Sequence, residues 1–374
     1  MALVRAAARL ADGASDVGRR VRRELAAQGP LTIAGVELAL ERHLATGPEK
    51  VRIDELVQAS GRAGYVHVVL ASNVFVGALQ ALAVAVAASR RVTVRLSRRE
   101  SVFARYLLEQ ARMEGVTIEQ RAEPSHQWMF EAWQAGQQVQ VHLYGRDETI
   151  GHIASGLDER VQVRAHGAGM GVVVVGKSAD ARRAADQVAQ DVIAFDQRGC
   201  LSPRVVFVEG GPAEATAFAQ ALAARLEAWA ERVPLGRLWP EEREQKQRYL
   251  LTCRMAGRVW EGAWGAVGLT PTALWVGPPG RHVHVVACEE PREGWVGQLA
   301  SMLAPLRHHV VALGIAGASS DALVATARAL CPEARVSDVG QMQRPLLDGF
   351  VDLRGPGPLT PRQVMQRYAV GPSG

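Results

Sequence analysis

Cysteines are few in this sequence and are not spaced in pairs. The four are Cys200, Cys253, Cys288 and Cys331. No two stand at the CxxC spacing of zinc, iron–sulfur or dithiol redox sites, so a metal centre of that kind is not expected. A chain of 374 residues is long enough to bury a core without disulfides, and unbridged cysteines fit a reducing cytoplasm.

Long apolar segments are also absent. The longest nearly apolar run, residues 74–88, contains Gln80 and is shorter than the roughly 20 residues that a bilayer-spanning helix needs. Residues 1–25 are rich in Arg and Ala, as in a transit peptide, but they carry acidic residues and have neither an apolar core nor a cleavage site. We therefore expect no membrane span, and we interpret the N-terminal stretch as a surface helix of the mature protein.

Lysine is nearly absent, and the charge is not of one sign. Apart from Lys50, Lys177 and Lys246, every basic residue is an arginine, which together with much Ala and Gly is typical of a GC-rich bacterial genome. The net charge is only +5, and arginines alternate with acids, as in residues 241–244 (EERE), which we interpret as a solvated helix face. A nucleic-acid-binding protein would carry a clustered basic stripe, so we expect no nucleic-acid partner.

Short β-branched runs alternate with helical patterns in the first half of the chain. The expected strands there are 66–70, 91–96, 116–120 and 138–143. With helices between them, they predict right-handed βαβ units and a mostly parallel, doubly wound sheet. Such sheets bind ligands beyond the carboxyl ends of their strands. The GxGxxG fingerprint of many dinucleotide sites is missing.

The pattern changes after residue 166 and indicates a second α/β domain. Its expected strands are 172–175, 205–208, 273–276, 282–288 and 310–315, and its longest expected helices are 179–195, 213–230 and 240–256. Short apolar runs of this kind are typical of strands that are covered on both faces. The chain is therefore expected to contain two α/β domains.

Cys200 differs from the other cysteines in its surroundings. It follows a long expected helix, has Gly199 beside it, and precedes an apolar strand. A thiol in such a loop is partly exposed and near backbone N–H groups, which favours the thiolate. The alternative is an inert core cysteine, because free cysteine is among the most buried residue types. The other three cysteines lie within apolar helix or strand patterns and are expected to be core residues.

Four stretches of the sequence form a set of motifs. In residues 195–203 (FDQRGCLSP) a Gln precedes a Cys and Ser-Pro follows it, and residues 70–74 (LASNV) contain an Asn at a strand end. Residues 94–97 (VRLS) end the next strand, and residues 339–345 (VGQMQRP) are followed by Asp348-Gly349. Together these stretches resemble the aldehyde dehydrogenase superfamily, and most of all its bacterial luminescence-type branch, the LuxC family of acyl-CoA reductases. In the same order, they resemble the nucleophile loop, the strand end whose Asn helps to form the oxyanion hole, the Lys-Pro-Ser strand end, and the Gly-x-Met-Gln-x-Pro and Asp-Gly segment.

The sequence also departs from these motifs. Arg95 replaces the superfamily lysine, Leu96 replaces the proline, and the aromatic–His approach to Asp-Gly is shortened to residues 346–347. The Glu-Leu-Gly-Gly general base is absent, since residues 164–169 read RAHGAG. Oxidation of an aldehyde to an acid needs a base that activates water, whereas acyl exchange with coenzyme A does not. The missing glutamate therefore favours thioester chemistry over hydrolysis.

The resemblance implies a mechanism with named residues. Cys200 would attack the acyl thioester as a thiolate, with the oxyanion held by the Asn73 side chain and the Cys200 backbone N–H, and coenzyme A would leave. His166 is our candidate for the proton donor. The alternative for His166 is a histidine at a strand end that only packs or caps.

The resemblance also implies a nicotinamide cofactor. Gly145, just before the helix expected near residue 148, resembles the superfamily's Gly-Ser turn and is assigned to the pyrophosphate, for which a helix start offers backbone N–H donors. Arg95, Ser97, Arg98 and Arg99 follow the second strand, where the adenosine ribose lies. Three arginines there suit a 2′-phosphate, so we expect NADPH rather than NADH. A solvated arginine cluster without a ligand is the alternative.

The resemblance implies an aldehyde-dehydrogenase-like α/β fold. Residues 1–165 with 333–374 would form the doubly wound nucleotide-binding domain, and residues 166–332 the catalytic domain. The expected function is NAD(P)H-dependent reduction of an acyl-CoA to an aldehyde through a cysteine-bound acyl-enzyme, in a cytoplasmic homo-oligomer without a metal. Two alternatives stay open: reduction of another activated acyl group, such as an acyl phosphate, and a degenerate member that acts as a scaffold or binding subunit.

Overall fold

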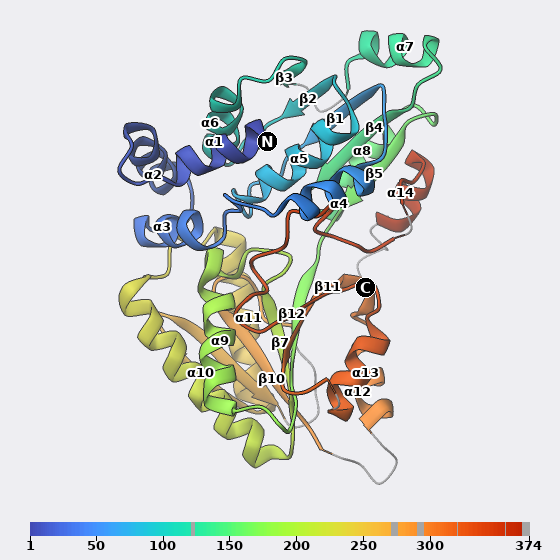
Figure 1. The fold of residues 1–374 in the computed structure, drawn as a ribbon. Coiled ribbons are helices and arrows are strands. Elements are labelled where there is room, and N and C mark those ends of the chain that lie inside the picture. Colours follow the sequence, from blue (N-terminus) through green and yellow to red (C-terminus); the bar gives the residue numbers. More distant parts are fainter. Residues whose placement is uncertain (121–123, 271–275, 290–294, 320, 356, 369–374) are drawn as a thin grey trace. The chain divides into compact units, whose positions relative to one another are not determined.

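The chain forms two compact units in a computed structural model (Figure 1). The structure describes residues 1–374 except 121–123, 271–275, 290–294, 320, 356 and 369–374. Unit 1 consists of residues 1–29, 40–168 and 346–374, and unit 2 consists of residues 30–39 and 169–345. Among the helices of the described residues, none has the length and apolar character that a membrane crossing requires.

Unit 1 is built around a five-stranded parallel sheet. The strands, in spatial order, are β3 (Val116–Glu119), β2 (Val92–Arg95), β1 (Tyr65–Val69), β4 (Val139–Tyr144) and β5 (Gln162–His166). The helices are α1 (Ala2–Ala11), α2 (Asp16–Gln28), α4 (Lys50–Ser60), α5 (Gly77–Ala88), α6 (Val102–Ala111), α7 (His126–Gln134), α8 (Asp147–Ser155) and α14 (Pro361–Tyr368), while α3 (Ile33–Arg42) belongs to both units. The chain order moves outward from β1 in both directions, which is the doubly wound arrangement.

The centre of this sheet is apolar because β1 is covered on both faces. All five residues of β1 are buried, and α5 beside it is buried along most of its length. Val68 pairs with Val94 of β2 and with His142 of β4, so the three strands end at the same edge. The segments that follow β1, β2 and β4 therefore share one edge of the sheet.

Unit 2 is built around a seven-stranded sheet. In spatial order the strands are β12 (Arg335–Asp338), β11 (Val310–Ala316), β6 (Met170–Val175), β7 (Pro203–Glu209), β10 (His282–Cys288), β9 (Gly265–Thr270) and β8 (Arg258–Gly262). All neighbours are parallel except β8, which is antiparallel to β9. The helices are α9 (Ala181–Ile193), α10 (Pro212–Arg232), α11 (Pro240–Ala256), α12 (Trp295–Leu303) and α13 (Ala322–Leu330), with short 3₁₀ turns η1 (Ala194–Gln197) and η2 (Arg307–His309).

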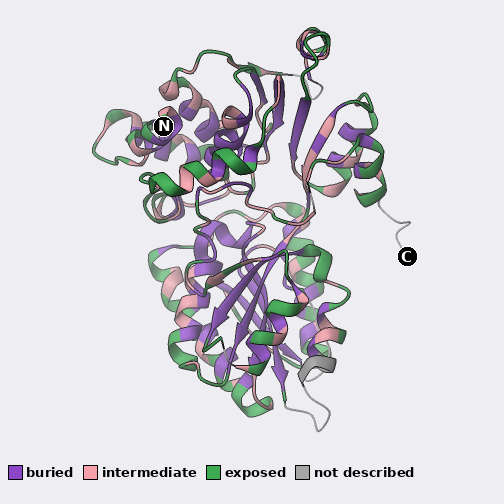
Figure 2. Cartoon of the chain, turned by 45° about the vertical axis from the view of Figure 1, so that its right-hand side comes forward, coloured by how far each residue is buried: buried purple, intermediate pink, exposed green. Residues whose placement is uncertain are grey.

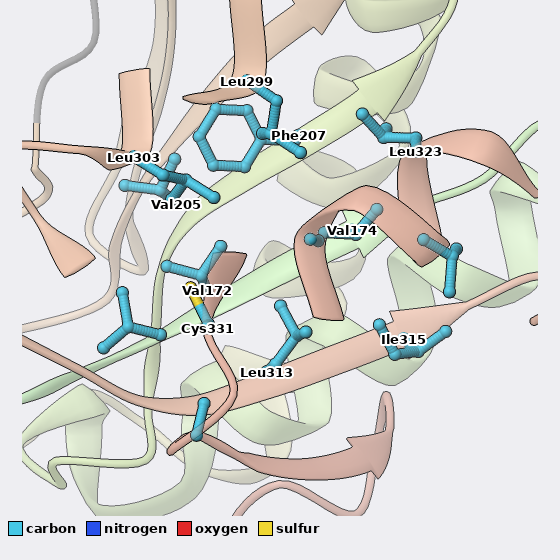
Figure 3. Close-up of a cluster of buried hydrophobic side chains, with 14 of the residues drawn as sticks. Val172, Val174, Val205, Phe207, Leu299, Leu303, Leu313, Ile315, Leu323 and Cys331 are labelled. Carbon is cyan, nitrogen blue, oxygen red and sulfur yellow. The ribbon is translucent and has the colours of Figure 1, made fainter. Parts of the chain in front are cut away.

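The inner strands of unit 2, from β11 to β9 in the spatial order, are buried, whereas the outward faces of its helices are exposed (Figure 2). One apolar cluster joins β6, β7 and β11 to α12 and α13 (Figure 3). Phe207, Leu313 and Leu323 are fully buried in it, and the buried Cys331 belongs to the same cluster. This packing fixes the sheet that carries the Cys200 loop.

The structure corrects several sequence-based expectations about the elements. The N-terminal stretch is two helices rather than one surface helix, and α1 buries one apolar face that includes Leu3 and Leu10. The strands β5, β8, β9 and β12 were not predicted. The predicted strand 273–276 falls largely outside the described residues, since 271–275 are not described.

The division into units also differs from the predicted boundaries. Residues 333–345 belong to unit 2 because β12 extends its sheet, with Leu313 of β11 paired to Val336. The chain rejoins unit 1 only at Leu346. Residues 30–39 also belong to unit 2, where the N–H of Arg237 donates to the Pro30 carbonyl at 2.7 Å.

Candidate active site

The loop before Cys200 has an unusual backbone. Phe195, Asp196 and Gln197 are three consecutive non-glycine residues in the left-handed region, with φ of 55°, 50° and 62°. This conformation costs an L-residue about 1–2 kcal/mol each, so surrounding contacts must maintain it. Strained segments of this kind cluster at functional sites. The run reverses the chain after α9 and leads it into the turn that contains Cys200.

Cys200 is the one cysteine of the four that is not buried. It lies in a turn that is closed by a hydrogen bond from the Ser202 N–H to the Gly199 carbonyl at 3.1 Å. The other three cysteines are buried, as predicted, and burial raises the pKa of each of their thiols, that of Cys288 to about 12. Cys200 is therefore the thiol that a reagent or a substrate can reach.

The side chain of Gln197 fastens this loop to two strands. It is fully buried and donates to the carbonyls of Pro203 at 2.6 Å and His282 at 2.7 Å. It also accepts from the His282 N–H at 2.6 Å. Because β7 begins at Pro203 and β10 at His282, one amide group connects the loop to the edges of two neighbouring strands. Sequence analysis identified the Gln only as part of a motif, not as this connector.

Gly171 of β6 lies directly against the Cys200 turn. Its N–H donates to the Ser202 carbonyl at 2.9 Å, and a Cβ at this position would collide with the carbonyl oxygen of Leu201. Met342, from the predicted C-terminal motif, packs against the same spot, with its methyl group 2.8 Å from where that Cβ would be. Part of the C-terminal motif therefore supports the Cys200 loop within unit 2.

Asp191 of α9 holds the start of that C-terminal segment. Its carboxylate Oδ2 accepts from the Gly340 N–H at 2.6 Å, while Oδ1 is buried without a hydrogen-bond partner. Burial raises the pKa of Asp191 to about 7, and hydrogen bonds from backbone N–H groups, including that of Gly340, oppose this rise. The anchor of the segment is thus a carboxyl group that titrates near neutral pH.

The sequence-predicted residues of unit 1 lie at the carboxyl edge of its sheet. Asn73 is exposed in the segment between β1 and α5. Arg95 ends β2, Ser97 accepts from the Arg99 N–H at 3.2 Å, and the side chains of Arg98 and Arg99 reach solvent. The fold brings these five residues to neighbouring strand ends, as the sequence predicted.

Gly145 lies at the same edge, but its surroundings are unfavourable for binding a pyrophosphate. Its N–H donates to the His166 carbonyl at 3.3 Å, so that amide is already used. The first turn of α8 carries Asp147 and Glu148, and Asp147 accepts from the Ala168 N–H at 2.6 Å. Acidic side chains there oppose the binding of a pyrophosphate. The role of Gly145 stays a prediction that these contacts do not favour.

His166 is held between two aromatic rings at the end of β5. Its ring stacks on Tyr144 at 4.5 Å and on Phe350 at 5.4 Å, measured between ring centroids. Burial lowers the pKa of His166 to about 4, so the ring is neutral at pH 7, and its Nε2 atom has no hydrogen-bond partner. A neutral imidazole is a weak acid. The predicted role of His166 as proton donor is not favoured by this environment.

One sequence interpretation of the α11 region is wrong. Glu242 does not lie on a solvated face: it is buried and accepts two hydrogen bonds from Arg198, at 2.9 and 2.8 Å. It also caps the helix, because its Oε2 accepts from the Trp239 N–H at 2.8 Å. The signal was present in the sequence, since Pro240 at the first helical position with a Glu two residues later marks a helix start.

The comparison that decides the family is a match over most of the chain. The family described as Acyl-CoA reductase (LuxC) matches residues 48–354. The chain belongs to this family. The resemblance stated from the four motifs is thereby confirmed. As a LuxC-family protein, the chain is an oxidoreductase. A comparison with curated proteins gave no match.

Solved structures confirm the aldehyde-dehydrogenase-like fold of this LuxC-family chain. The γ-glutamyl-γ-aminobutyraldehyde dehydrogenase of Burkholderia cenocepacia J2315 aligns with a TM-score of 0.64 and 15% identity, covering 98% of this chain and 81% of that one. The methylmalonate-semialdehyde dehydrogenase of Oceanimonas doudoroffii gives 0.64 and 14%, covering 97% and 83%. The propionaldehyde dehydrogenase of a Clostridium phytofermentans microcompartment gives 0.59 and 10%, covering 97% and 89%.

Proposed function

We propose that this LuxC-family protein reduces an acyl-CoA thioester to an aldehyde, with Cys200 as the nucleophile. The observation that carries the proposal is the Cys200 loop, in which a partly exposed thiol follows three left-handed residues and stands in a tight turn. Strain maintained beside the one accessible thiol is what a covalent mechanism needs, because the nucleophile must be held in a fixed direction.

The first step is an acyl transfer. The Cys200 thiolate adds to the thioester carbon, the tetrahedral intermediate collapses, and the C–S bond to coenzyme A breaks, which leaves an acyl group on Cys200 and a free coenzyme A thiolate. The Asn73 side chain and the Cys200 N–H are the proposed donors to the oxyanion. The departing thiolate needs no general base, which agrees with the absence of the glutamate at residues 164–169.

Unit 1 fits a nicotinamide dinucleotide. Its strand order, β3-β2-β1-β4-β5, puts a change of winding direction beside β1, where doubly wound sheets bind such ligands. Arg95 and Ser97 would hold the adenosine ribose, and Arg98 and Arg99 a 2′-phosphate, so NADPH is the proposed form. When bound, the dinucleotide supplies the hydride that the acyl group on Cys200 accepts. Collapse of the resulting thiohemiacetal anion releases the aldehyde and restores the Cys200 thiolate.

The test is the oxidation of NADPH with a series of acyl-CoAs of increasing chain length, using wild type and Cys200→Ala. We expect turnover with wild type and loss of at least a thousandfold with Cys200→Ala, while the dinucleotide still binds. Cys331→Ala, which removes a buried thiol of unit 2, is the matched control and should stay active.

Two other outcomes separate the alternatives. Turnover with an acyl phosphate and none with any acyl-CoA would replace the proposed substrate by the second class. Dinucleotide binding with no turnover on either substrate would indicate a scaffold or binding subunit.

A further inference from the structure

Four buried charged side chains lie together at the strained run of residues 195–197, and one of them, Asp196, belongs to the run. Asp196, within that run, is 2% exposed, and its Oδ1 atom lies 2.6 Å from Nη2 of Arg281, a side chain with no exposed surface. The Nε atom of Arg281 also donates to Oδ1 at 2.9 Å. Asp196 is therefore held by a two-point contact with a buried guanidinium. Burial lowers the pKa of Arg281, and Asp196 opposes that shift.

A second arginine continues the network to α11. Arg198 contacts the other oxygen of Asp196, with Nη1 3.2 Å from Oδ2. Its opposite edge makes the two-point contact with Glu242 at the start of α11. The order Arg281–Asp196–Arg198–Glu242 alternates in sign, and the four formal charges cancel. We call these four residues the charge network.

The charge network reaches the backbone of two further segments. Arg281 donates from Nη1 to the Val233 carbonyl at 2.8 Å, and Arg198 from Nη2 to the Arg237 carbonyl at 2.9 Å. The N–H of Gly236 donates to Oδ2 of Asp196 at 3.0 Å, and the N–H of Gly280 donates to its backbone carbonyl at 3.0 Å. Asp196 is thus held by both its side chain and its main chain, through partners at residues 198, 236 and 280–281.

This arrangement explains why three residues remain in a backbone region that L-residues avoid. A buried charge is costly unless it is paired, and both ion pairs of Asp196, with Arg281 and with Arg198, are made with Asp196 left-handed and its carboxylate between the two arginines. If the run relaxed, Asp196 would move and the two arginines would lose their shared partner. The penalty for separating buried pairs therefore opposes the relaxation of the backbone.

We propose that the charge network is a positioning device for Cys200, in which Asp196 and Arg281 hold residues 195–197 left-handed and thereby set the direction of the Cys200 turn. The benefit of this device for catalysis rests on the proposed function. Its effect on the reactivity of the Cys200 thiol does not, and it can be measured separately. Asp196 and Arg281 are positioning residues, since they act through the backbone.

The first test is the pH profile of Cys200 alkylation by iodoacetamide, measured by mass spectrometry of the peptide that contains Cys200. The variants are Asp196→Asn, which keeps an acceptor for Gly236, and Asp196→Ala. Relaxation of the turn should move the partly exposed Cys200 thiol from the position that it holds there and slow its alkylation. We expect the alkylation rate at pH 7 to fall at least fivefold in Asp196→Ala and by a smaller factor in Asp196→Asn. Circular dichroism should show that both variants are folded.

The second test is a rescue by glycine. Asp196→Gly lacks the same ion pairs as Asp196→Ala, but glycine adopts the left-handed region without penalty. We expect Asp196→Gly to recover at least part of the alkylation rate and of kcat, with KM for the acyl-CoA nearly unchanged. If the network contributed only to overall stability, the alkylation rate and kcat of Asp196→Gly would be no higher than those of Asp196→Ala. Glu24→Gln, which neutralises a carboxylate bound to Arg105 and Tyr106 in unit 1, is the control and should not change the alkylation rate.

The outcomes separate the two proposals. If wild type reduces no acyl-CoA, the proposed function fails while the alkylation comparison still stands. If wild type is active and all folded Asp196 variants share its alkylation profile, the positioning device is overturned. Should Asp196→Ala not fold, Arg281→Lys takes its place, because it keeps the charge and loses the two-point contact. An unchanged alkylation profile in Arg281→Lys, together with no recovery in Asp196→Gly, would equally overturn it.

Discussion

Gly171 and Gln197 show how single residues determine the Cys200 turn. Gly171 leaves no room for a methyl group beside the Leu201 carbonyl, and the Gln197 amide makes three hydrogen bonds that join the loop to two strands. The sequence identified Cys200 through its surroundings and its motif. It did not identify Gly171, because the local sequence of a strand does not show which distant backbone group packs against a glycine. Here that group is the Leu201 carbonyl.

At the residue scale, we predict that Gly171→Ala impairs catalysis more than stability. The added Cβ must push the Leu201 carbonyl, and overpacking of this kind costs about 1–3 kcal/mol. The melting temperature should fall by a few degrees, while kcat with an acyl-CoA falls at least tenfold because Cys200 is displaced. Gly47→Ala is the matched control, since nothing lies within 4 Å of a Cβ at that position. Equal kcat in the two variants would contradict the prediction.

A second residue-scale prediction concerns the preference for NADPH. Replacing Arg98 and Arg99 by Ala should weaken NADPH binding roughly ten- to hundredfold, because each charge-assisted hydrogen bond to a 2′-phosphate would be lost. NADH lacks this phosphate and should hardly respond. Arg90→Ala, which removes an exposed arginine before β2, is the control. Equal losses for both dinucleotides in a fluorescence titration would mean that these arginines do not recognise the 2′-phosphate.

At the scale of elements, the sequence predicted the strands and helices with strong apolar patterns. The helix of residues 240–256 was predicted with the bounds of α11, and the strand of residues 282–288 with those of β10. Three of the four missed strands have weaker patterns: β12 at one edge alternates between exposed and half-buried residues, β8 at the other edge has no buried residue, and β5 carries Gln, Arg and His. The fourth, β9, is fully buried, but two of its six residues are glycines. Pairing with a neighbour, rather than local composition, makes these segments strands.

The anchor between α9 and the C-terminal segment leads to a pH prediction. The folded pKa of Asp191 is about 7 because of burial, against 3.8 for an ordinary Asp, so folding favours the protonated carboxyl. Its contribution to stability is therefore fully present below pH 4 and is lost as the pH rises through 7. Relative to Asp191→Asn, wild type should lose on the order of 3 kcal/mol of unfolding free energy between pH 4 and pH 8.

Chemical denaturation at several pH values tests this. The control is Asp186→Asn, which neutralises another carboxylate of α9, one that accepts a hydrogen bond from the Gln190 side chain at 3.0 Å. A difference between wild type and Asp191→Asn that is constant across the pH range would show that Asp191 does not titrate as described. If the stability difference between wild type and Asp186→Asn changed with pH in the same way, the effect would come from the overall charge of α9 and not from Asp191.

At the scale of the whole molecule, each unit is assembled from segments that are distant in the chain. In unit 1, Val163 of β5 and Leu359 exchange two backbone hydrogen bonds, at 2.7 and 2.8 Å, and the Gln80 side chain donates to the carbonyls of Leu346 and Gly349. Val364 of α14 is fully buried against β4, β5 and α8. The segment 346–368 is therefore part of the core of unit 1.

We predict that Val364→Ala loosens unit 1 selectively. The cavity should cost about 1–3 kcal/mol and accelerate amide hydrogen exchange in β4, β5 and α8. Exchange in β6, β7 and β11 should stay as in wild type, because these strands belong to unit 2. Val336→Ala, at a half-exposed position of β12, serves as the control and should leave both sets unchanged. Faster exchange throughout the protein would show that the two units unfold together.

The interleaving of the two units also sets the order in which they can be completed during translation. Unit 2 has all of its residues once position 345 has left the ribosome, whereas unit 1 still lacks the segment that carries Gly349, Leu359 and Val364. The sheet of unit 1 is therefore the first to be synthesised, but the unit is the last to be complete. Until its final segment arrives, the apolar face of β4 and β5 has no α14 to cover it, and a nascent chain in this state is a natural client for a chaperone.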